Sequence, residues 1–193
     1  MLFRNLGNGA FTRITTGHPV IDGVTSICAA WADYDRDGFL DLFVATAWGC
    51  PSPDDLLYRN NGDGTFRKMT IPEVGLVVGE SLSGDTVMWA DVDNDGWPEL
   101  SRTMKDERSA DSSWTNQLLH LDSEGKFYLM DIGEMKRGTE GMTSAVWGDF
   151  DNDGLLDAVV GADRGLLGLY RNLAGQGFTN MASAFSTPVT NTG

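Results

Sequence analysis

Three short segments of the chain place aspartates at alternate positions and follow them with a glycine. The aspartates are Asp33, Asp35 and Asp37 in the first segment, Asp91, Asp93 and Asp95 in the second, and Asp149, Asp151 and Asp153 in the third. Carboxylates crowded in this way repel one another, and a bound divalent cation is the usual remedy. The glycine at the sixth position allows a sharp turn that points alternate acids inward. The spacing therefore predicts three metal-binding loops.

Each loop offers further oxygen donors after the glycine. Position seven would supply a backbone carbonyl, from Phe39, Trp97 and Leu155, and position nine an acid, from Asp41, Glu99 and Asp157. An EF-hand instead needs a glutamate at position twelve. This chain has Val44, Arg102 and Val160 there. The loops therefore represent a different kind of site, closed at position nine and set between strands.

Calcium is the metal that this donor set favours. It takes about six to eight oxygen ligands from a flexible loop, whereas magnesium prefers fewer carboxylates in a rigid octahedron. The loops contain no His or Cys, which zinc and copper sites use. One such segment could equally be a solvated turn, but three in register, each with a ninth acid, indicate about three calcium ions. The second loop departs most from the pattern, because Pro98 stiffens it and Glu99 reaches further than aspartate.

The overall charge limits the partners of the chain. Its net charge is -14, and twelve of its 28 acids lie in the three loops. A nucleic-acid surface needs a positive footprint, so we expect no nucleic-acid partner, and anionic membranes are disfavoured. No apolar run is long enough to enter a bilayer. The N-terminus lacks the features of a secretory signal, so either sequence outside this chain directs secretion or the protein stays in the cytoplasm.

The two cysteines, Cys28 and Cys50, exclude a disulfide-dense scaffold. A bridge between them is one reading. The alternative, which we favour, is a buried apolar Cys28 and a free thiol at Cys50 in a loop.

The acidic loops belong to a repeat. The segments that contain them begin at Trp31, Trp89 and Trp147, a constant spacing of 58 residues. A second landmark, Leu-Tyr-Arg-Asn or a variant followed by a glycine-containing turn and a phenylalanine, occupies 57–66, 118–127 and 169–178. It also occurs at 2–11 without an acidic loop before it. The chain therefore starts midway through a repeat.

Each repeat predicts four short antiparallel strands, at 27–32, 40–45, 57–60 and 66–70 in the first copy. No stretch has convincing helical periodicity. The predicted fold is all-β, a partial β-propeller of about three four-stranded blades plus half a blade at the N-terminus. As one propeller segment, 1–193 divides into a half-blade at 1–15, blades at 16–70, 71–131 and 132–182, and a tail at 183–193.

Propellers close with about four to eight blades, so this chain does not complete a ring by itself. It is either a fragment of a longer protein or a chain whose open blade edges associate with another copy, because unpaired edges promote aggregation. The recurrent Trp31, Trp89 and Trp147 are interpreted as packing between blades rather than as ligand contacts.

These residues resemble the FG-GAP or VCBS-type repeats of integrin alpha-subunit propellers and bacterial surface proteins. The resemblance covers about residues 1–182, and its most specific part is Trp-Ala-Asp-x-Asp-x-Asp-Gly-x-x-Asp followed by Leu-Tyr-Arg-Asn. It implies a ring of about seven blades, with calcium in the loop between strands one and two of a blade. The implied ligands are the position 1, 3, 5 and 9 acids and the Phe39-type carbonyl.

The function that follows is a calcium-binding propeller module, acting as an extracellular or cell-surface binding and adhesion scaffold, with structural calcium. Its partner would be a protein or a carbohydrate, bound through loops 47–56, 71–82, 102–116 and 131–141. The extracellular location is inferred from the resemblance and from calcium supply.

We expect no enzymatic activity. Neither His18 nor His120 has a visible catalytic partner, and no nucleophile elbow or phosphate-binding loop is present. His120 stands where the other repeats have Arg59 and Arg171, which suggests a residue on the surface of a blade. The alternative is a calcium-containing propeller domain of a secreted enzyme or carbohydrate-binding protein, inactive as this segment.

Overall fold

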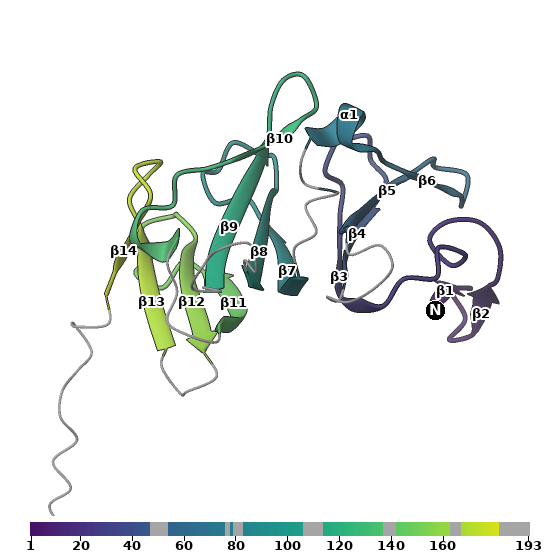
Figure 1. Cartoon of the computed structure of the whole chain (residues 1–193), viewed down its shortest axis with the longest axis horizontal. Helices are drawn as coiled ribbons and strands as arrows, with labels where there is room; N and C mark the ends of the chain where they lie inside the picture. Colours follow the sequence, from purple (N-terminus) through teal and green to yellow (C-terminus); the bar gives the residue numbers. More distant parts are fainter. Residues whose placement is uncertain are drawn as a thin grey trace, which may run out of the picture.

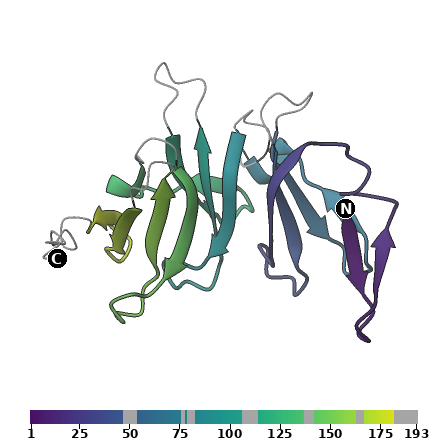
Figure 2. The same ribbon diagram turned by 90° about the horizontal axis from the view of Figure 1, so that it is seen from below.

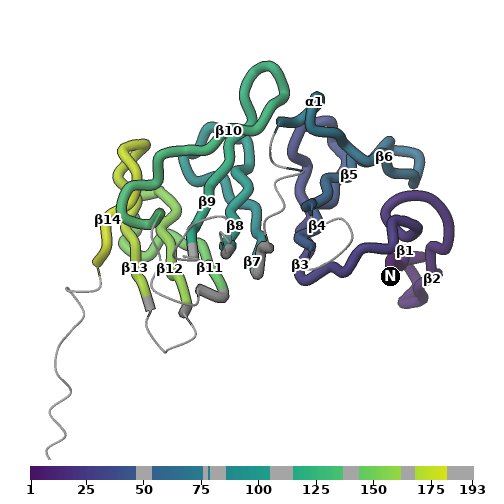
Figure 3. Tube along the Cα trace, viewed as in Figure 1, coloured from purple at the N-terminus to yellow at the C-terminus, as the bar shows by residue number. Residues whose placement is uncertain are grey.

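The computed structural model describes residues 1–46, 54–75, 78, 83–105, 114–136, 142–162 and 167–181. These residues form four separate antiparallel sheets that stand side by side in chain order (Figures 1 and 3). The all-β fold predicted from the repeat, with about three blades and half a blade, is confirmed. Among the described residues, the helices are too short and too polar to cross a membrane.

The first sheet has two strands and the other three have four each. The half-blade pairs β1 (Leu2–Asn5) with β2 (Phe11–Ile14). Blade 1 contains β3 (Ser26–Ala32), β4 (Asp41–Thr46), β5 (Leu56–Asn60) and β6 (Phe66–Lys68). Blade 2 contains β7 (Ser83–Ala90), β8 (Glu99–Lys105), β9 (Trp114–Leu121) and β10 (Phe127–Leu129). Blade 3 contains β11 (Met142–Gly148), β12 (Asp157–Ala162), β13 (Leu167–Asn172) and β14 (Phe178–Asn180).

The core lies between the blades. Successive side chains of a strand point to opposite faces, so each blade contributes to the interface on either side of it. In β4, Leu42 packs with residues of its own blade on the face toward the N-terminus, while Phe43 joins a cluster shared with blade 2. In β9, Leu119 enters that cluster and Leu118 enters the one shared with blade 3. Strand β4 is therefore buried along its whole length, and between Asp41 and Thr46 it is a continuous apolar run because both of its faces are covered.

Trp89 confirms the predicted packing between blades. Its ring lies 6.4 Å from the rings of Tyr34 and Phe43 in blade 1, measured between centroids, and 6.1 Å from Phe127 in its own blade. Trp31 occupies the same position in blade 1, but it packs on Phe66 of its own sheet and is 46% exposed. The difference arises because Trp89 faces the four-stranded sheet of blade 1, whereas Trp31 faces the two-stranded half-blade.

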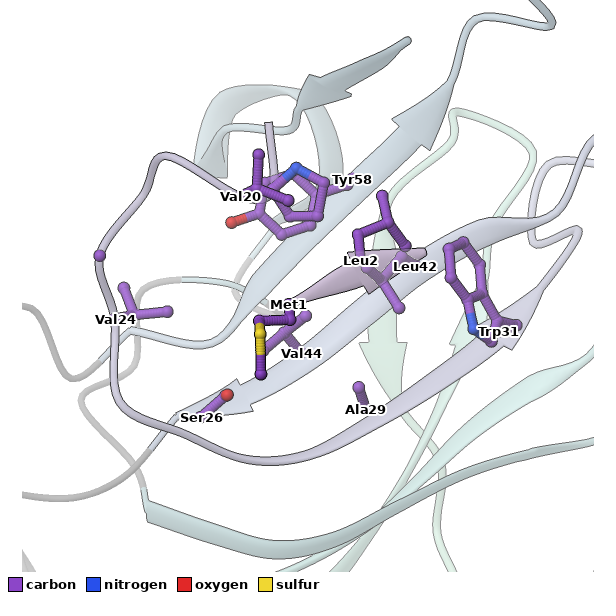
Figure 4. A pocket seen from close by; sticks show the side chains of 12 residues that line it. Met1, Leu2, Val20, Val24, Ser26, Ala29, Trp31, Leu42, Val44 and Tyr58 are labelled. Carbon is purple, nitrogen blue, oxygen red and sulfur yellow. The ribbon is translucent and has the colours of Figure 1, made fainter. Parts of the chain in front are cut away.

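A cavity of about 380 Å³ separates the half-blade from blade 1. Figure 4 shows that Leu2 of β1 and Trp31, Leu42 and Val44 of blade 1 lie around it, with Tyr58 at one end. The half-blade therefore covers the outward face of blade 1 only partly, which explains why Trp31 remains accessible.

Two short helical turns begin the connections between blades, where the sequence pattern predicted no helix. They are α1 (Ile71–Val74), after blade 1, and η2 (Glu134–Lys136), after blade 2. Thr70 precedes α1, and both its amide and its hydroxyl donate to Glu73 Oε2, at 3.0 and 2.7 Å. The Thr-x-x-Glu spacing with a proline in the first turn is a helix-start signal. One turn is too short to give helical periodicity, which is why that criterion missed it.

Asp55 and Arg102 form a buried ion pair between blades 1 and 2. Arg102 Nη1 donates to Asp55 Oδ2 at 3.1 Å, and the two side chains are 2% and 3% exposed. The other carboxylate oxygen accepts the Thr46 amide at 2.9 Å, and Arg102 Nε donates to Gln117 at 2.9 Å. Burial raises the pKa of Asp55 to about 6, although the guanidinium opposes that shift.

The tryptophans allow the packing between blades to be tested with a matched pair. We expect Trp89→Ala to lower the free energy of unfolding by about 3 kcal/mol, because it leaves a cavity among Tyr34, Phe43 and Phe127. Trp31→Ala should cost less than about 1 kcal/mol, because its ring is already half exposed. Urea unfolding followed by intrinsic fluorescence or circular dichroism measures both. Equal costs would contradict the assignment of the core to the blade interfaces.

Candidate metal centres

The acidic loops join the first strand of each blade to the second, and the three have the same backbone course. Position six is a glycine in the left-handed region, with φ of 91°, 86° and 90° at Gly38, Gly96 and Gly154. Position four is also left-handed, at Arg36, Asn94 and Asn152. The sequence interpretation did not identify position four, although asparagine tolerates this conformation better than most residues and stands there in two of the loops.

The position-one acid closes each turn. Asp33 accepts the Asp37 amide at its Oδ1 and the Gly38 amide at its Oδ2, both at 2.9 Å. Asp149 accepts the equivalent amides of the third loop at 3.1 and 3.0 Å. Asp91 accepts only the Gly96 amide, at 3.0 Å, and its Oδ1 is buried without a hydrogen-bond partner among the described residues. The first acid is therefore both a turn former and a candidate ligand.

The position-nine acid lies at the start of strand two and is almost fully buried, with Asp41, Glu99 and Asp157 at most 1% exposed. Asp41 accepts the Tyr34 amide at 3.3 Å and the Asn60 amide at 2.7 Å. These two bonds connect the acidic loop, strand two and strand three. Burial raises the pKa of Asp41 to about 6 and that of Glu99 to about 7.

The other position-nine acids repeat this role. Asp157 accepts the Phe150 amide at 3.1 Å and the Asn172 amide at 2.8 Å. Glu99 accepts the Val92 amide at 2.8 Å. The acid that closes the predicted site is therefore also a structural part of each blade.

Acids gather into one cluster per loop, with ligand atoms within 4.8 Å of one another. The clusters are Asp33, Asp35 and Asp37; then Asp93, Asp95, Glu99 and His120; then Asp149, Asp151 and Asp157. Three predicted ligands, Asp41, Asp91 and Asp153, lie in the loops outside these tight groups. The predicted carbonyl donors Phe39, Trp97 and Leu155 donate their amides to the position-five acids, at 3.0, 2.8 and 3.0 Å. Their role as ligands stays a prediction.

An arginine from strand three neutralises the acids in the first and third loops. Arg59 donates to Asp35 at 2.5 Å and to Asp37 at 2.8 Å. Arg171 Nε lies 2.7 Å from Asp151 Oδ2, and its Nη2 donates to Asp153 at 3.2 Å. Both arginines belong to the repeated landmark in the sequence, but the sequence pattern alone did not predict that they reach the loops. The recurrence of an arginine in the landmark that follows each of these two acidic loops was the sequence signal that could have predicted these ion pairs.

The interpretation of His120 as a surface residue was wrong. Its side chain is only 13% exposed, and its Nδ1 lies 2.7 Å from Glu99 Oε1. His18 also has an acidic partner, since its Nδ1 lies 2.6 Å from Asp22 Oδ1 and Tyr58 donates to Asp22 Oδ2 at 2.5 Å. The hydrogen bonds among His18, Asp22 and Tyr58 connect the segment before β3 to strand β5.

The acidic loops lie at one end of the blades (Figure 2), and neighbouring loops contact one another there. Arg36 of the first loop stacks over the ring of Trp97 in the second, 5.1 Å from its centroid. Asn94 of the second loop donates to the Gly154 carbonyl of the third at 2.6 Å. Asn60 of the β5–β6 hairpin donates to Leu40 at 3.0 Å, so this hairpin lies at the same end.

Four-stranded sheets in series, each with this acidic loop, match a known repeat. A scan against protein families matches residues 1–44 and 46–100, just over half of the chain, to the FG-GAP-like repeat. The chain belongs to the FG-GAP-like repeat family. The match supports the assignment of the FG-GAP-like sheets as β-propeller blades. A search among curated proteins gave no match.

The predicted partner-binding loops of this FG-GAP-like chain lie mainly outside the described residues. This holds for 47–53, 76–77, 79–82, 106–113 and 137–141, and for Cys50, so a bridge to Cys28 is not addressed. The tail at 182–193 is also outside them. Asp55 lies near the end of the predicted partner-binding loop 47–56, but its side chain is buried in the ion pair with Arg102 and is not available to a partner.

The buried acids predict how the stability of the metal-free protein depends on pH. Asp41, Asp55 and Glu99 have raised pKa values of about 6, 6 and 7 when folded, so between about pH 4 and 7 the folded chain binds more protons than the unfolded chain. Stability then falls as pH rises through that window. In chelator, the melting temperature should be several degrees lower at pH 7.5 than at pH 5.

A matched variant isolates one of these groups. Glu99→Gln removes the charge but keeps the shape of the side chain, so it should weaken the pH dependence and raise the melting temperature at pH 7.5 in chelator. A melting temperature that rises between pH 5 and 7.5 in the native sequence would contradict the assignment.

Proposed function

We propose that the chain is a calcium-dependent β-propeller module that serves as a binding scaffold outside the cell or at its surface. The observation that carries the proposal is the recurrence of one carboxylate cluster at the same loop of three successive blades. Solvated acidic turns need not converge in this way, and oxygen-rich flexible loops are what calcium prefers. No catalytic role is part of the proposal.

Calcium in these loops would be structural. An ion held by acids one, three and five would neutralise the repulsion that the arginines offset only in the first and third loops. The loops also touch across blades, through Arg36 on Trp97 and Asn94 on Gly154. Ordering one loop would therefore help to position its neighbour. Binding to the folded chain alone adds stability by mass action.

The scaffold role follows from the difference between the two ends of each blade. The loops at one end of the sheets are occupied by acids and by contacts with each other. The connections between strands two and three, and between blades, are the segments left to vary with a protein or carbohydrate partner. An extracellular location is part of the proposal because sites of this class, with dissociation constants on the order of 10⁻⁴–10⁻³ M, fill where calcium is abundant.

Calcium titration of the chelator-stripped chain by calorimetry tests the proposal, with thermal melting alongside. We expect about three ions and a higher melting temperature. At calcium concentrations of about 10 to 100 times the dissociation constant, each site would add roughly 1.4 to 2.7 kcal/mol. A chain that folds but binds no calcium at 10-fold higher concentration than these constants would end the calcium proposal.

Single-loop variants assign the ions. Asp35→Asn should lower the stoichiometry by about one ion and reduce the calcium-dependent rise in melting temperature. Glu124→Gln, an exposed acid in the β9–β10 hairpin, is the matched control and should leave both quantities unchanged. Equal losses in the two variants would point to diffuse attraction by the net charge instead of loop binding.

A further inference from the structure

The second loop differs from its neighbours in the side chain that faces its acids. In the first and third loops strand three supplies an arginine, which forms ion pairs with the acids at positions three and five. In the second loop the same strand position is His120. Among the described residues, no lysine or arginine forms an ion pair with an acid of this loop. Its carboxylates are accordingly neutralised less than those of the other two loops.

His120 is held in an orientation suited to a metal ligand. Its Nδ1 lies 2.7 Å from Glu99 Oε1, and Glu99 is itself fixed by the Val92 amide at 2.8 Å. When Glu99 is ionised it accepts the Nδ1 proton, which leaves the Nε2 lone pair available. A carboxylate that orients a histidine through its other nitrogen is a common outer-shell arrangement at metal sites.

The free nitrogen faces an acid at a separation that suits two ligands of one ion. His120 Nε2 lies 3.6 Å from Asp95 Oδ2, which is too long for a hydrogen bond. Two ligands bound tetrahedrally to zinc at roughly 2.0–2.2 Å lie about 3.4 Å apart. Ligand atoms of Asp93, Asp95, Glu99 and His120 all fall within 4.8 Å of one another.

The position-one acid of this loop, which lies outside the tight group of ligand atoms, also differs from its counterparts. Asp91 Oδ1 is buried and has no hydrogen-bond partner among the described residues, whereas Asp33 Oδ1 and Asp149 Oδ1 accept a loop amide. A buried polar atom without a partner is costly, so the second loop is less well satisfied by its own amides than the other two. An open hollow of about 740 Å³, lined by Asp95 and His120 with Trp97 and Tyr128, gives an ion a path to the loop.

We propose that the second loop is a zinc-selective site, bound through His120 Nε2 with Asp93 and Asp95 and oriented by Glu99, while the outer loops remain oxygen-only sites. This rests on the proposed function in one respect, that the loops hold cations. Imidazole favours zinc over calcium, and mixed histidine and carboxylate ligands are usual for zinc. In calcium alone the loop still offers its carboxylates, so the selectivity appears only when zinc is present.

The test is zinc titration of the chelator-stripped chain by calorimetry in saturating calcium, with cobalt as a spectroscopic substitute that reports nitrogen ligation. We expect one zinc ion per chain. His120→Arg installs the residue that the other blades carry, and should weaken zinc binding at least roughly tenfold. Arg59→His is the reciprocal variant, and should create a second zinc site at the first loop.

The outcomes separate this inference from the calcium proposal. Zinc binding of unchanged affinity in His120→Arg overturns the inference, even if about three calcium ions still bind. Zinc binding that depends on His120 in a chain that binds no calcium supports it, while the calcium proposal fails. Circular dichroism confirms folding of each variant, and His120→Gln replaces His120→Arg if the latter does not fold.

Discussion

The buried acid at the start of strand two is the constraint on which each blade depends. Asp41, Glu99 and Asp157 are buried, yet each accepts the amide of the second residue of its acidic loop, and Asp41 and Asp157 also accept an amide of strand three. A buried carboxylate is tolerated only when its oxygens are satisfied. Because these bonds fix the loop to the sheet, the remaining acids are brought together before any ion binds.

The blades in turn depend on one another. A single four-stranded sheet exposes two apolar faces, and here those faces are covered by the next sheet, as Leu118 and Leu119 show by entering different clusters. Contacts between loops follow the same order, from Arg36 to Trp97 and from Asn94 to Gly154. Packing and candidate metal sites are therefore coupled along the chain, as expected where each repeat contacts only its neighbours.

The sequence predicted the fold class, the blade repeat and the place of the loops, because each rests on a periodic pattern of strong local signals. It predicted Trp89 correctly as a packing residue. It missed the roles of Arg59 and Arg171 and misread His120, since these side chains reach the loops from strand three and only the register of strands two and three brings them there. The α1 turn was not predicted, because a single helical turn is too short to show helical periodicity. The metal ligands themselves remain predictions.

The Asp55–Arg102 pair bears on how a chain of near-identical sheets assembles. Position twelve is valine in blades 1 and 3, so blade 2 alone of the three has a guanidinium at this position of strand two. Docked in the wrong order, blade 2 would bury that charge without its carboxylate, at a cost that is large compared with the small differences among apolar interfaces. The pair therefore makes the interface between blades 1 and 2 specific, because no other pairing of the three described blades satisfies both charges. This specificity reduces misassembly among sheets that resemble one another.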